Sequence, residues 1–201
     1  MVPVYCVTTD PKGPRALRTI EEFRPYGINP IIVRGFDNKK WNLKPLTEMH
    51  HNEGFPYFID WRATGCYLSH WMTWNHLILS KVPYAMIVED DIKLCGNFTN
   101  EFEAGYAELP SDWGYGLVGH CCAGGKPANV ITPRISDIRW PMCTHCYIVK
   151  LDALEKMIEP MAECRSPIDI AIFENVFSRG IVKCYTFTPR LAVQYDTFLH
   201  D

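Results

Sequence analysis

The sequence predicts an α/β fold in which a mostly parallel central sheet carries helices on both faces. Short apolar runs alternate along the chain with patterns typical of helices, the order expected when strands and helices follow one another. The run from Tyr84 to Val88 is apolar without interruption, which is typical of a strand covered on both faces of a parallel sheet. Because no internal repeat, low-complexity tract or linker interrupts this alternation, we expect one domain over residues 1–201.

Apolar runs of strand length predict strands at Val2–Thr8, Ile31–Val33, Tyr84–Val88, Tyr115–Val118, Cys146–Val149 and Ile181–Phe187. Helical spacing predicts helices at Arg15–Phe23, Thr64–Ser80, Asn97–Leu109 and Leu151–Met161. The helix at 64–80 is apolar on nearly every side, so we expect it to be buried. A last helix is expected to have Ser166 as its N-cap and Pro167 at its first position, and to end at Gly180. The stretches 36–60 and 119–140 lack periodicity and predict functional loops.

Composition and charge exclude several classes of protein. A hydrophobic fraction of 47% with 21% charged residues is typical of an ordered globular chain. The formal net charge of −3 provides no basic field for a polyanion, so nucleic acid is not an expected partner. No apolar run approaches the ~18 residues of a membrane helix and no signal peptide is evident, so we expect a cytoplasmic protein, in the host cytoplasm if the source is viral. We expect most of the nine cysteines to be free thiols.

The strongest chemical signal is the acidic run Glu89-Asp90-Asp91, which directly follows the apolar strand. Three adjacent carboxylates repel one another and therefore need a compensating positive charge. Ligands of open α/β sheets bind at the carboxyl ends of strands, and carboxylates there suit a hard cation such as Mn²⁺ or Mg²⁺. Such a cation would neutralise charge developing on a diphosphate leaving group. The alternative is a solvent-exposed acidic turn.

Together with a second motif, this run resembles glycosyltransferase family 25. Gly65-Cys66-Tyr67-Leu68-Ser69-His70 precedes Ile87-Val88-Glu89-Asp90-Asp91, and both are similar to motifs of that family, which includes lipopolysaccharide-building transferases and collagen galactosyltransferases. Weaker similarities follow the family's order along the chain: Val4–Val7 with Asp10, Arg15 and Arg18; Gly35-Phe36-Asp37; Tyr147-Ile148-Val149; Pro167-Ile168-Asp169; and Pro189–Gln194.

The resemblance implies a Rossmann-like glycosyltransferase fold of the A type and a hexosyl- or pentosyltransferase that moves a sugar from a UDP-sugar to a hydroxyl with inversion. It implies that Asp91 and Asp90 hold the metal ion and that Asp169 is the catalytic base. It also implies nucleotide-sugar contacts from Glu89, Asp90, Asp37, Arg15, Ser69 and His70. His200 is the better metal ligand by residue type and Gln194 by similarity to the family, so both remain candidates for completing the metal site.

Several residues have a second interpretation. Adjacent side chains on a helix diverge by about 100°, so Ser69 and His70 cannot form a catalytic dyad along it and are expected to be hydrogen-bonded residues lining the donor pocket. Asp169 could instead be a helix-capping residue opposite Ser166. The residues His120, Cys121, Cys122, Cys143, His145 and Cys146 suggest zinc, but Cys146 starts an apolar strand pattern, which favours a buried small side chain.

Three other functions fit parts of the sequence. A saccharide is the expected acceptor, whereas a hydroxylated base in viral DNA would require a nucleic-acid partner that the acidic balance does not support. A non-catalytic nucleotide- or carbohydrate-binding domain could keep the same fold without turnover. A metal-dependent phosphohydrolase is a weaker alternative, since the sequence has one acidic cluster and no His-rich metal motif.

Overall fold

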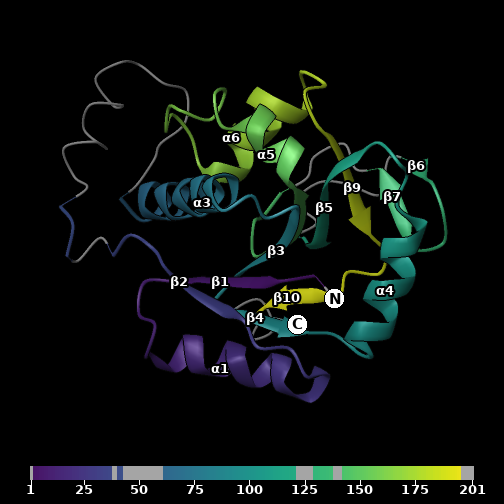
Figure 1. Cartoon of the computed structure of the whole chain (residues 1–201), viewed down its shortest axis with the longest axis horizontal. Helices are drawn as coiled ribbons and strands as arrows, with labels where there is room; N and C mark the ends of the chain where they lie inside the picture. Colours follow the sequence, from purple (N-terminus) through teal and green to yellow (C-terminus); the bar gives the residue numbers. More distant parts are fainter. Residues whose placement is uncertain (1, 38–39, 43–60, 121–128, 138–141, 196–201) are drawn as a thin grey trace.

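The computed structural model describes residues 2–37, 40–42, 61–120, 129–137 and 142–195 (Figure 1). Its strands are β1 Val4–Thr8, β2 Ile31–Arg34, β3 Tyr84–Glu89, β4 Ile92–Leu94, β5 Trp113–Gly119, β6 Asn129–Val130, β7 Ile135–Asp137, β8 Cys146–Lys150, β9 Lys183–Phe187 and β10 Ala192–Gln194. Its helices are α1 Pro14–Phe23, the 3₁₀ turn η1 Arg24–Tyr26, α3 Trp61–Leu79, α4 Phe98–Glu108, α5 Leu151–Met157, α6 Ile168–Ile172 and the π-helical turn η2 Phe173–Phe177.

The strands of the described residues form one sheet in the order β2-β1-β3-β8-β5-β9-β7-β6, and β10 joins β4 to β5. The α/β class is therefore confirmed. The sheet, however, is mixed rather than mostly parallel. Strands β2, β1 and β3 run parallel, but β8 lies antiparallel between β3 and β5. Strand β3 thus has the central position expected of an unbroken apolar run, although only one of its neighbours is parallel.

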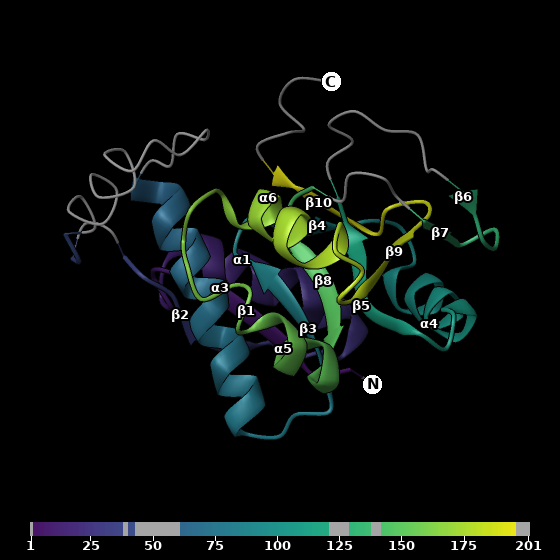
Figure 2. The same cartoon turned by 90° about the horizontal axis from the view of Figure 1, so that it is seen from above.

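Helices cover both faces of the sheet, as Figures 1 and 2 show. Side chains alternate along each strand, so Tyr5 and Val7 of β1 face one way while Val4 and Cys6 face the other. The first pair belongs to the core formed with α3, α5 and α6, and the second to the core formed with α1 and α4. Each strand of the centre is therefore apolar on both sides, which explains its continuous hydrophobic sequence.

Most predicted strands and helices are present, but three expectations about them differ from the structure. Helix α3 buries Trp74 and Leu77 but leaves Met72 and Leu79 exposed, so it covers the sheet from one side instead of lying inside the protein. The predicted cap at Ser166 is wrong: Pro167 is the N-cap of α6, and no side-chain hydrogen bond caps that end. Part of the expected loop at 119–140 forms the hairpin β6–β7, and the rest of that loop and most of 36–60 lie outside the described residues.

None of the described helices is both long and apolar enough to cross a membrane.

The register of the sheet brings four strand ends to one edge. Val7 pairs with Glu89, and Thr8 pairs with Arg34, so β1, β2 and β3 end side by side. Strand β8 runs the opposite way and begins at this edge, where its first residue, Cys146, pairs with Val88. The chain continues from β2 through α3 to β3 on the other side of β1, so the strand order reverses here. This reversal is where open α/β sheets bind their ligands.

Candidate functional site

A cavity of about 380 Å³ lies at this edge of the sheet, a volume sufficient for a small ligand. Its walls come from the ends of β1 and β3, the loop before α1, and the first half of α3. The lining residues are Val7, Thr8, Thr9, Asp10, Gly13, Pro14, Arg15, Phe36, Arg62, Gly65, Cys66, Ser69, His70, Glu89 and Asp90. Five of the predicted site residues therefore share one cavity: Arg15, Ser69, His70, Glu89 and Asp90.

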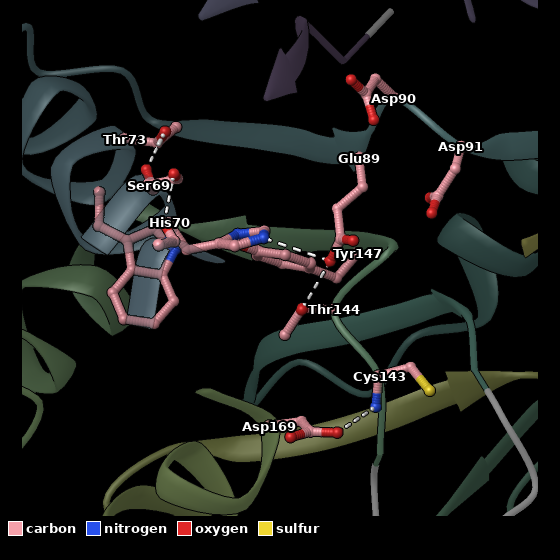
Figure 3. Close-up of polar contacts among 12 residues, drawn as sticks. Ser69, His70, Thr73, Glu89, Asp90, Asp91, Cys143, Thr144, Tyr147 and Asp169 are labelled. Carbon is pink, nitrogen blue, oxygen red and sulfur yellow. Dashed lines mark hydrogen bonds and ion pairs between the residues drawn. The ribbon is translucent and has the colours of Figure 1, made fainter. Parts of the chain in front are cut away.

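The three acids of the Glu89–Asp91 run do not form a single patch. Figure 3 shows Glu89 turned towards Tyr147, away from Asp90 and Asp91. The other two carboxylates meet at Arg15, whose Nη2 lies 2.8 Å from Asp90 Oδ1 and 2.8 Å from Asp91 Oδ2. Thr8 Oγ1 also donates a hydrogen bond of 2.5 Å to Asp90 Oδ2. The compensating positive charge that the sequence requires is thus supplied in this structure by an arginine.

The backbone of Asp91 is held by the end of the described chain. Tyr195 N donates a hydrogen bond of 2.7 Å to Asp91 O, and Tyr195 Oη donates one of 2.6 Å to Glu22 of α1. The guanidinium of Arg18 lies 4.6 Å from the centre of the Tyr195 ring. Gln194 pairs with Ile92 in the β10–β4 ladder, so this candidate ligand does lie beside the acidic run. His200, the other candidate, lies outside the described residues.

Glu89 is held by a separate polar network. Its Oε1 accepts a hydrogen bond of 2.8 Å from Thr144 Oγ1 and lies 3.4 Å from His70 Nε2. The opposite ring nitrogen of His70, Nδ1, lies 2.9 Å from Tyr147 Oη, which also accepts a hydrogen bond of 2.8 Å from Trp74 Nε1. Figure 3 shows His70, Glu89, Thr144 and Tyr147 converging on one another. Thr144, Tyr147 and Trp74 were not predicted as site residues, and Tyr147 alone carried a signal, as part of a family-like strand.

Helix α3 is fixed against the end of β2 by Ser69. Ser69 Oγ donates to Gly65 O at 2.6 Å and accepts from the Phe36 backbone N–H at 2.8 Å. A Cβ on Gly35 would lie 2.6 Å from Ser69 Oγ, so only glycine permits this close approach. The prediction that Ser69 and His70 are hydrogen-bonded residues of the pocket wall agrees with these contacts.

Burial and neighbouring groups set the charge of the pocket. Burial alone would raise the pKa of Glu89, but the neighbouring His70, the hydrogen bond from Thr144 and the charge of His145 lower that pKa overall, so the group is a carboxylate. Burial, with the negative charge of Glu89 beside it, raises the pKa of the Cys66 thiol well above its usual value. Burial also raises the pKa of Cys6 under Asp90 to about 12. Both cysteines are therefore neutral thiols.

Asp169 lies outside the lining of this cavity. It stands at the start of α6, where its carboxylate accepts hydrogen bonds from the backbone N–H of Cys143 at 3.2 Å and of Ile170 at 2.9 Å. Its link to the cavity runs through residues 143–145, which also hold Glu89 (Figure 3). The carboxylate therefore orders the segment before β8, and the predicted capping partnership with Ser166 is absent because α6 begins one residue later than expected.

Two further groups of predicted residues lie away from the cavity. Asp37 does not line it, and its carboxylate lies 3.5 Å from Lys40 Nζ. Cys143 is disulfide-bonded, an exception to the expected free thiols, whereas Cys6, Cys66, Cys95, Cys146, Cys164 and Cys184 are free. Because Cys143 is oxidised and Cys146 is buried inside β8, the pair 143/146 cannot hold zinc.

Residues 21–114 match glycosyltransferase family 25, described as LPS biosynthesis protein. No curated protein matches the sequence.

Solved structures show the same fold. A glycosyltransferase involved in the glycosylation of the major capsid of PBCV-1 aligns with a TM-score of 0.51 at 12% identity, covering 92% of this chain and 80% of that one. A protein from STIV aligns with a TM-score of 0.51 at 12% identity, over 98% and 91% of the two chains. A putative glucose-1-phosphate thymidylyltransferase from Bacillus anthracis, in complex with a sucrose, gives 0.51 at 13% identity, over 96% and 89%.

At these identities the structural likenesses establish a fold and not a reaction. The reaction class comes from the family match, whose range includes both the α3 motif and the Glu89–Asp91 run, two of the segments that contribute to the cavity. Residues 21–114 therefore match glycosyltransferase family 25, and this match supports the assignment of the protein as a glycosyltransferase.

Proposed function

We propose that the protein transfers a sugar from a UDP-sugar to a hydroxyl group with inversion, in a reaction that requires Mn²⁺ or Mg²⁺. The observation that carries this proposal is the convergence of Asp90 and Asp91 on one cationic atom at the edge of the cavity. A nucleotide diphosphate brings negative charge to the same place, where the strand order reverses.

The two carboxylates fit a hard cation. Arg15 Nη2 contacts an oxygen of each at 2.8 Å, so two anionic oxygens already converge on a single positive charge. Oxygen ligands of this kind suit Mn²⁺ and Mg²⁺, which bind through one or two carboxylates together with phosphate oxygens. Asp91 and Asp90 would hold the ion, and Gln194 or His200 would complete the protein's share of the site. When bound, the ion supplies charge neutralisation for the departing diphosphate.

The remaining roles belong to the walls of the cavity. Arg15 would bind the diphosphate, since its guanidinium is 54% exposed and carries five donors. Ser69 and His70 would position the donor from α3, and Glu89 would accept hydrogen bonds from its ribose or sugar. Asp37, which follows β2, would contact the nucleotide from outside the lining of the cavity. The side chains of α3 that face the sheet keep this wall rigid, which favours one orientation of the donor.

Asp169 is the proposed catalytic base. Inverting transfer requires a group that accepts the proton of the attacking hydroxyl on the side opposite the leaving diphosphate. Asp169 contacts the same 143–145 segment that holds Glu89, and it lies on the other side of Glu89 from Asp90 in Figure 3. A saccharide hydroxyl is the proposed acceptor. A hydroxylated base in DNA receives no support from a chain with a formal net charge of −3.

Calorimetric titration of UDP with Mn²⁺ and with chelator tests the metal and the donor together. We expect UDP to bind at least ~10-fold more tightly with Mn²⁺, and Asp91→Asn to remove that difference. Asp152→Asn changes an exposed acid of α5 and is the matched control. Slow hydrolysis of UDP-sugars in the absence of acceptor would identify the donor sugar. Equal UDP affinity with and without metal would refute the metal-dependent mechanism.

A further inference from the structure

A second group of potential metal ligands lies on the floor of the cavity, apart from Asp90 and Asp91. Cys66 Sγ, His70 Nε2 and a carboxylate oxygen of Glu89 all lie within 4.8 Å of one another. Two of the residues are one helical turn apart on α3, which places them on the same face of the helix, and the third ends β3. All three line the cavity.

The His70 ring nitrogen that faces this group is unsatisfied. His70 is 1% exposed, and within the part of the chain that the structure describes its Nε2 has no hydrogen-bond partner. Glu89 Oε1 is 3.4 Å from this nitrogen, too far for a normal N–H···O bond. A buried polar atom without a partner is costly, so this unsatisfied nitrogen needs an explanation.

The distance between His70 Nε2 and Glu89 Oε1 fits two ligands of one tetrahedral ion. Zinc bonds of about 2.0–2.1 Å to nitrogen and oxygen and about 2.3 Å to sulfur place ligand atoms roughly 3.3–3.6 Å apart. The measured 3.4 Å between His70 and Glu89 falls in this range. The outer limit of 4.8 Å means that a side-chain shift of about 1 Å would close the site around an ion.

The surroundings have the second layer of hydrogen bonds that metal sites need. Tyr147 Oη lies 2.9 Å from His70 Nδ1, and because a hydroxyl can donate or accept, it supports the ring in either tautomer. Thr144 Oγ1 donates to Glu89 Oε1 and fixes that carboxylate. Partners of this kind orient a histidine and a carboxylate towards a bound ion.

We propose that Cys66, His70 and Glu89 form a zinc site with three protein ligands and a fourth position open to the cavity. A thiolate with an imidazole selects a borderline-soft ion such as Zn²⁺ over Mg²⁺ or Mn²⁺. Binding releases the Cys66 thiol proton to solvent, and the thiolate and the carboxylate then balance the two charges of the ion. The fourth position takes a water molecule or an oxygen of a ligand in the cavity.

The zinc site shares His70 and Glu89 with the proposed donor pocket, but its ligands are separate from Asp90 and Asp91, the carboxylates proposed to hold Mn²⁺ or Mg²⁺. Glu89 turns away from Asp90 and Asp91 (Figure 3), and those two carboxylates contact Arg15. The two sites also differ in chemistry, because one offers sulfur and nitrogen and the other oxygen alone. Zinc binding and metal-linked UDP binding are therefore measured separately, and the failure of one does not imply the failure of the other.

Cobalt substitution tests the zinc site directly. The full-length protein, stripped with chelator, is titrated with Co²⁺, which gives visible bands when tetrahedral and a near-ultraviolet charge-transfer band when a thiolate binds it. We expect one Co²⁺ per chain, both sets of bands, and displacement by one equivalent of Zn²⁺. Cys66→Ser should remove the charge-transfer band and weaken Zn²⁺ binding by more than about 100-fold, the upper end of the effect of losing a supporting residue.

Three further variants separate the alternatives. Cys164→Ser removes another partly buried thiol and should leave the spectrum unchanged, which excludes adventitious binding elsewhere. Asp91→Asn should also leave it unchanged, although it abolishes metal-linked UDP binding. His70→Gln should shift the visible bands, with circular dichroism and thermal melts confirming that each variant folds. No stoichiometric Co²⁺ in the wild type, or a charge-transfer band that survives in Cys66→Ser, would overturn the proposal.

Discussion

Removing the hydroxyl of Tyr147 should lower the stability of the protein. Tyr147→Phe removes one oxygen atom from a fully buried ring and leaves the ring in place. That oxygen accepts the Trp74 Nε1–H bond of 2.8 Å and contacts His70 Nδ1 at 2.9 Å. Leaving a buried donor or acceptor unpaired costs about 1–3 kcal/mol, and both the Trp74 N–H and His70 Nδ1 would lose their partner. Because they share one partner and their losses are not additive, we expect a decrease of about 2–4 kcal/mol in the free energy of unfolding.

Urea denaturation and thermal melts of the variant and the wild type measure this effect. For a chain of this length the expected loss corresponds to a decrease in Tm of roughly 4–16 °C. Tyr115→Phe is the matched control: its ring stacks on Tyr147 with centroids 4.6 Å apart, yet the change leaves the bonds to Trp74 and His70 intact. If Tyr147→Phe changes the free energy of unfolding by less than about 0.5 kcal/mol, the network does not hold Trp74 and His70 as described.

Two further predictions concern a buried histidine and the proposed base. Burial lowers the pKa of His145, which is 2% exposed, so the folded protein resists its protonation while the unfolded chain accepts a proton below about pH 6.5. Stability should therefore fall as the pH drops from about 7.5 to 5, by at most about 1.4 kcal/mol per pH unit from this group. In urea denaturation at several pH values, His145→Gln should reduce this pH dependence, whereas the same change at the exposed His76 is the control and should leave it in place. Asp169→Asn keeps an acceptor for the Cys143 N–H but cannot take a proton, so kcat should fall by ~10²-fold or more with UDP affinity and Tm nearly unchanged. Turnover within a few-fold of wild type would exclude Asp169 as the base.

Hydrophobic patterning was sufficient to predict the layers of the fold but not the directions of its strands. Continuous apolar runs such as Tyr84–Val88 and Cys146–Val149 require burial on both faces, and both strands lie inside the sheet. Direction depends on how the connecting segments cross the sheet, which the same runs do not encode. The antiparallel insertion of β8 was therefore missed. The start of α6 was also misplaced, because Ser166 has the residue type of a cap without its hydrogen bond.

The candidate site was predictable where its residues are close in sequence. The spacing of Ser69 and His70 on one helix, and the position of Glu89 and Asp90 at a strand end, were enough to bring these residues into one cavity. Partners that are distant in sequence carry no such signal. The Thr144–Glu89 bond, for example, joins residues 55 positions apart and depends on the antiparallel entry of β8. The sequence marks Cys66 only as part of a family-like motif, since nothing local indicates that its thiol faces Glu89.

Arg15 separates the acidic run into two parts, because it binds Asp90 and Asp91 but not Glu89. In the sequence the run is a single patch of three charges, but β3 ends at Glu89, so this side chain enters the cavity while Asp90 and Asp91 turn to the arginine. A divalent cation at these two acids must compete with a guanidinium that already neutralises them. The competition is a modest one, because Arg15 is 54% exposed and can rotate into solvent without leaving a buried charge unpaired. A diphosphate gives the displaced guanidinium a new anionic partner, so metal and donor should bind together more favourably than either alone. We therefore expect Mn²⁺ to bind weakly to the free protein and tightly only with UDP, because the arginine must leave the acids before the cation can replace it.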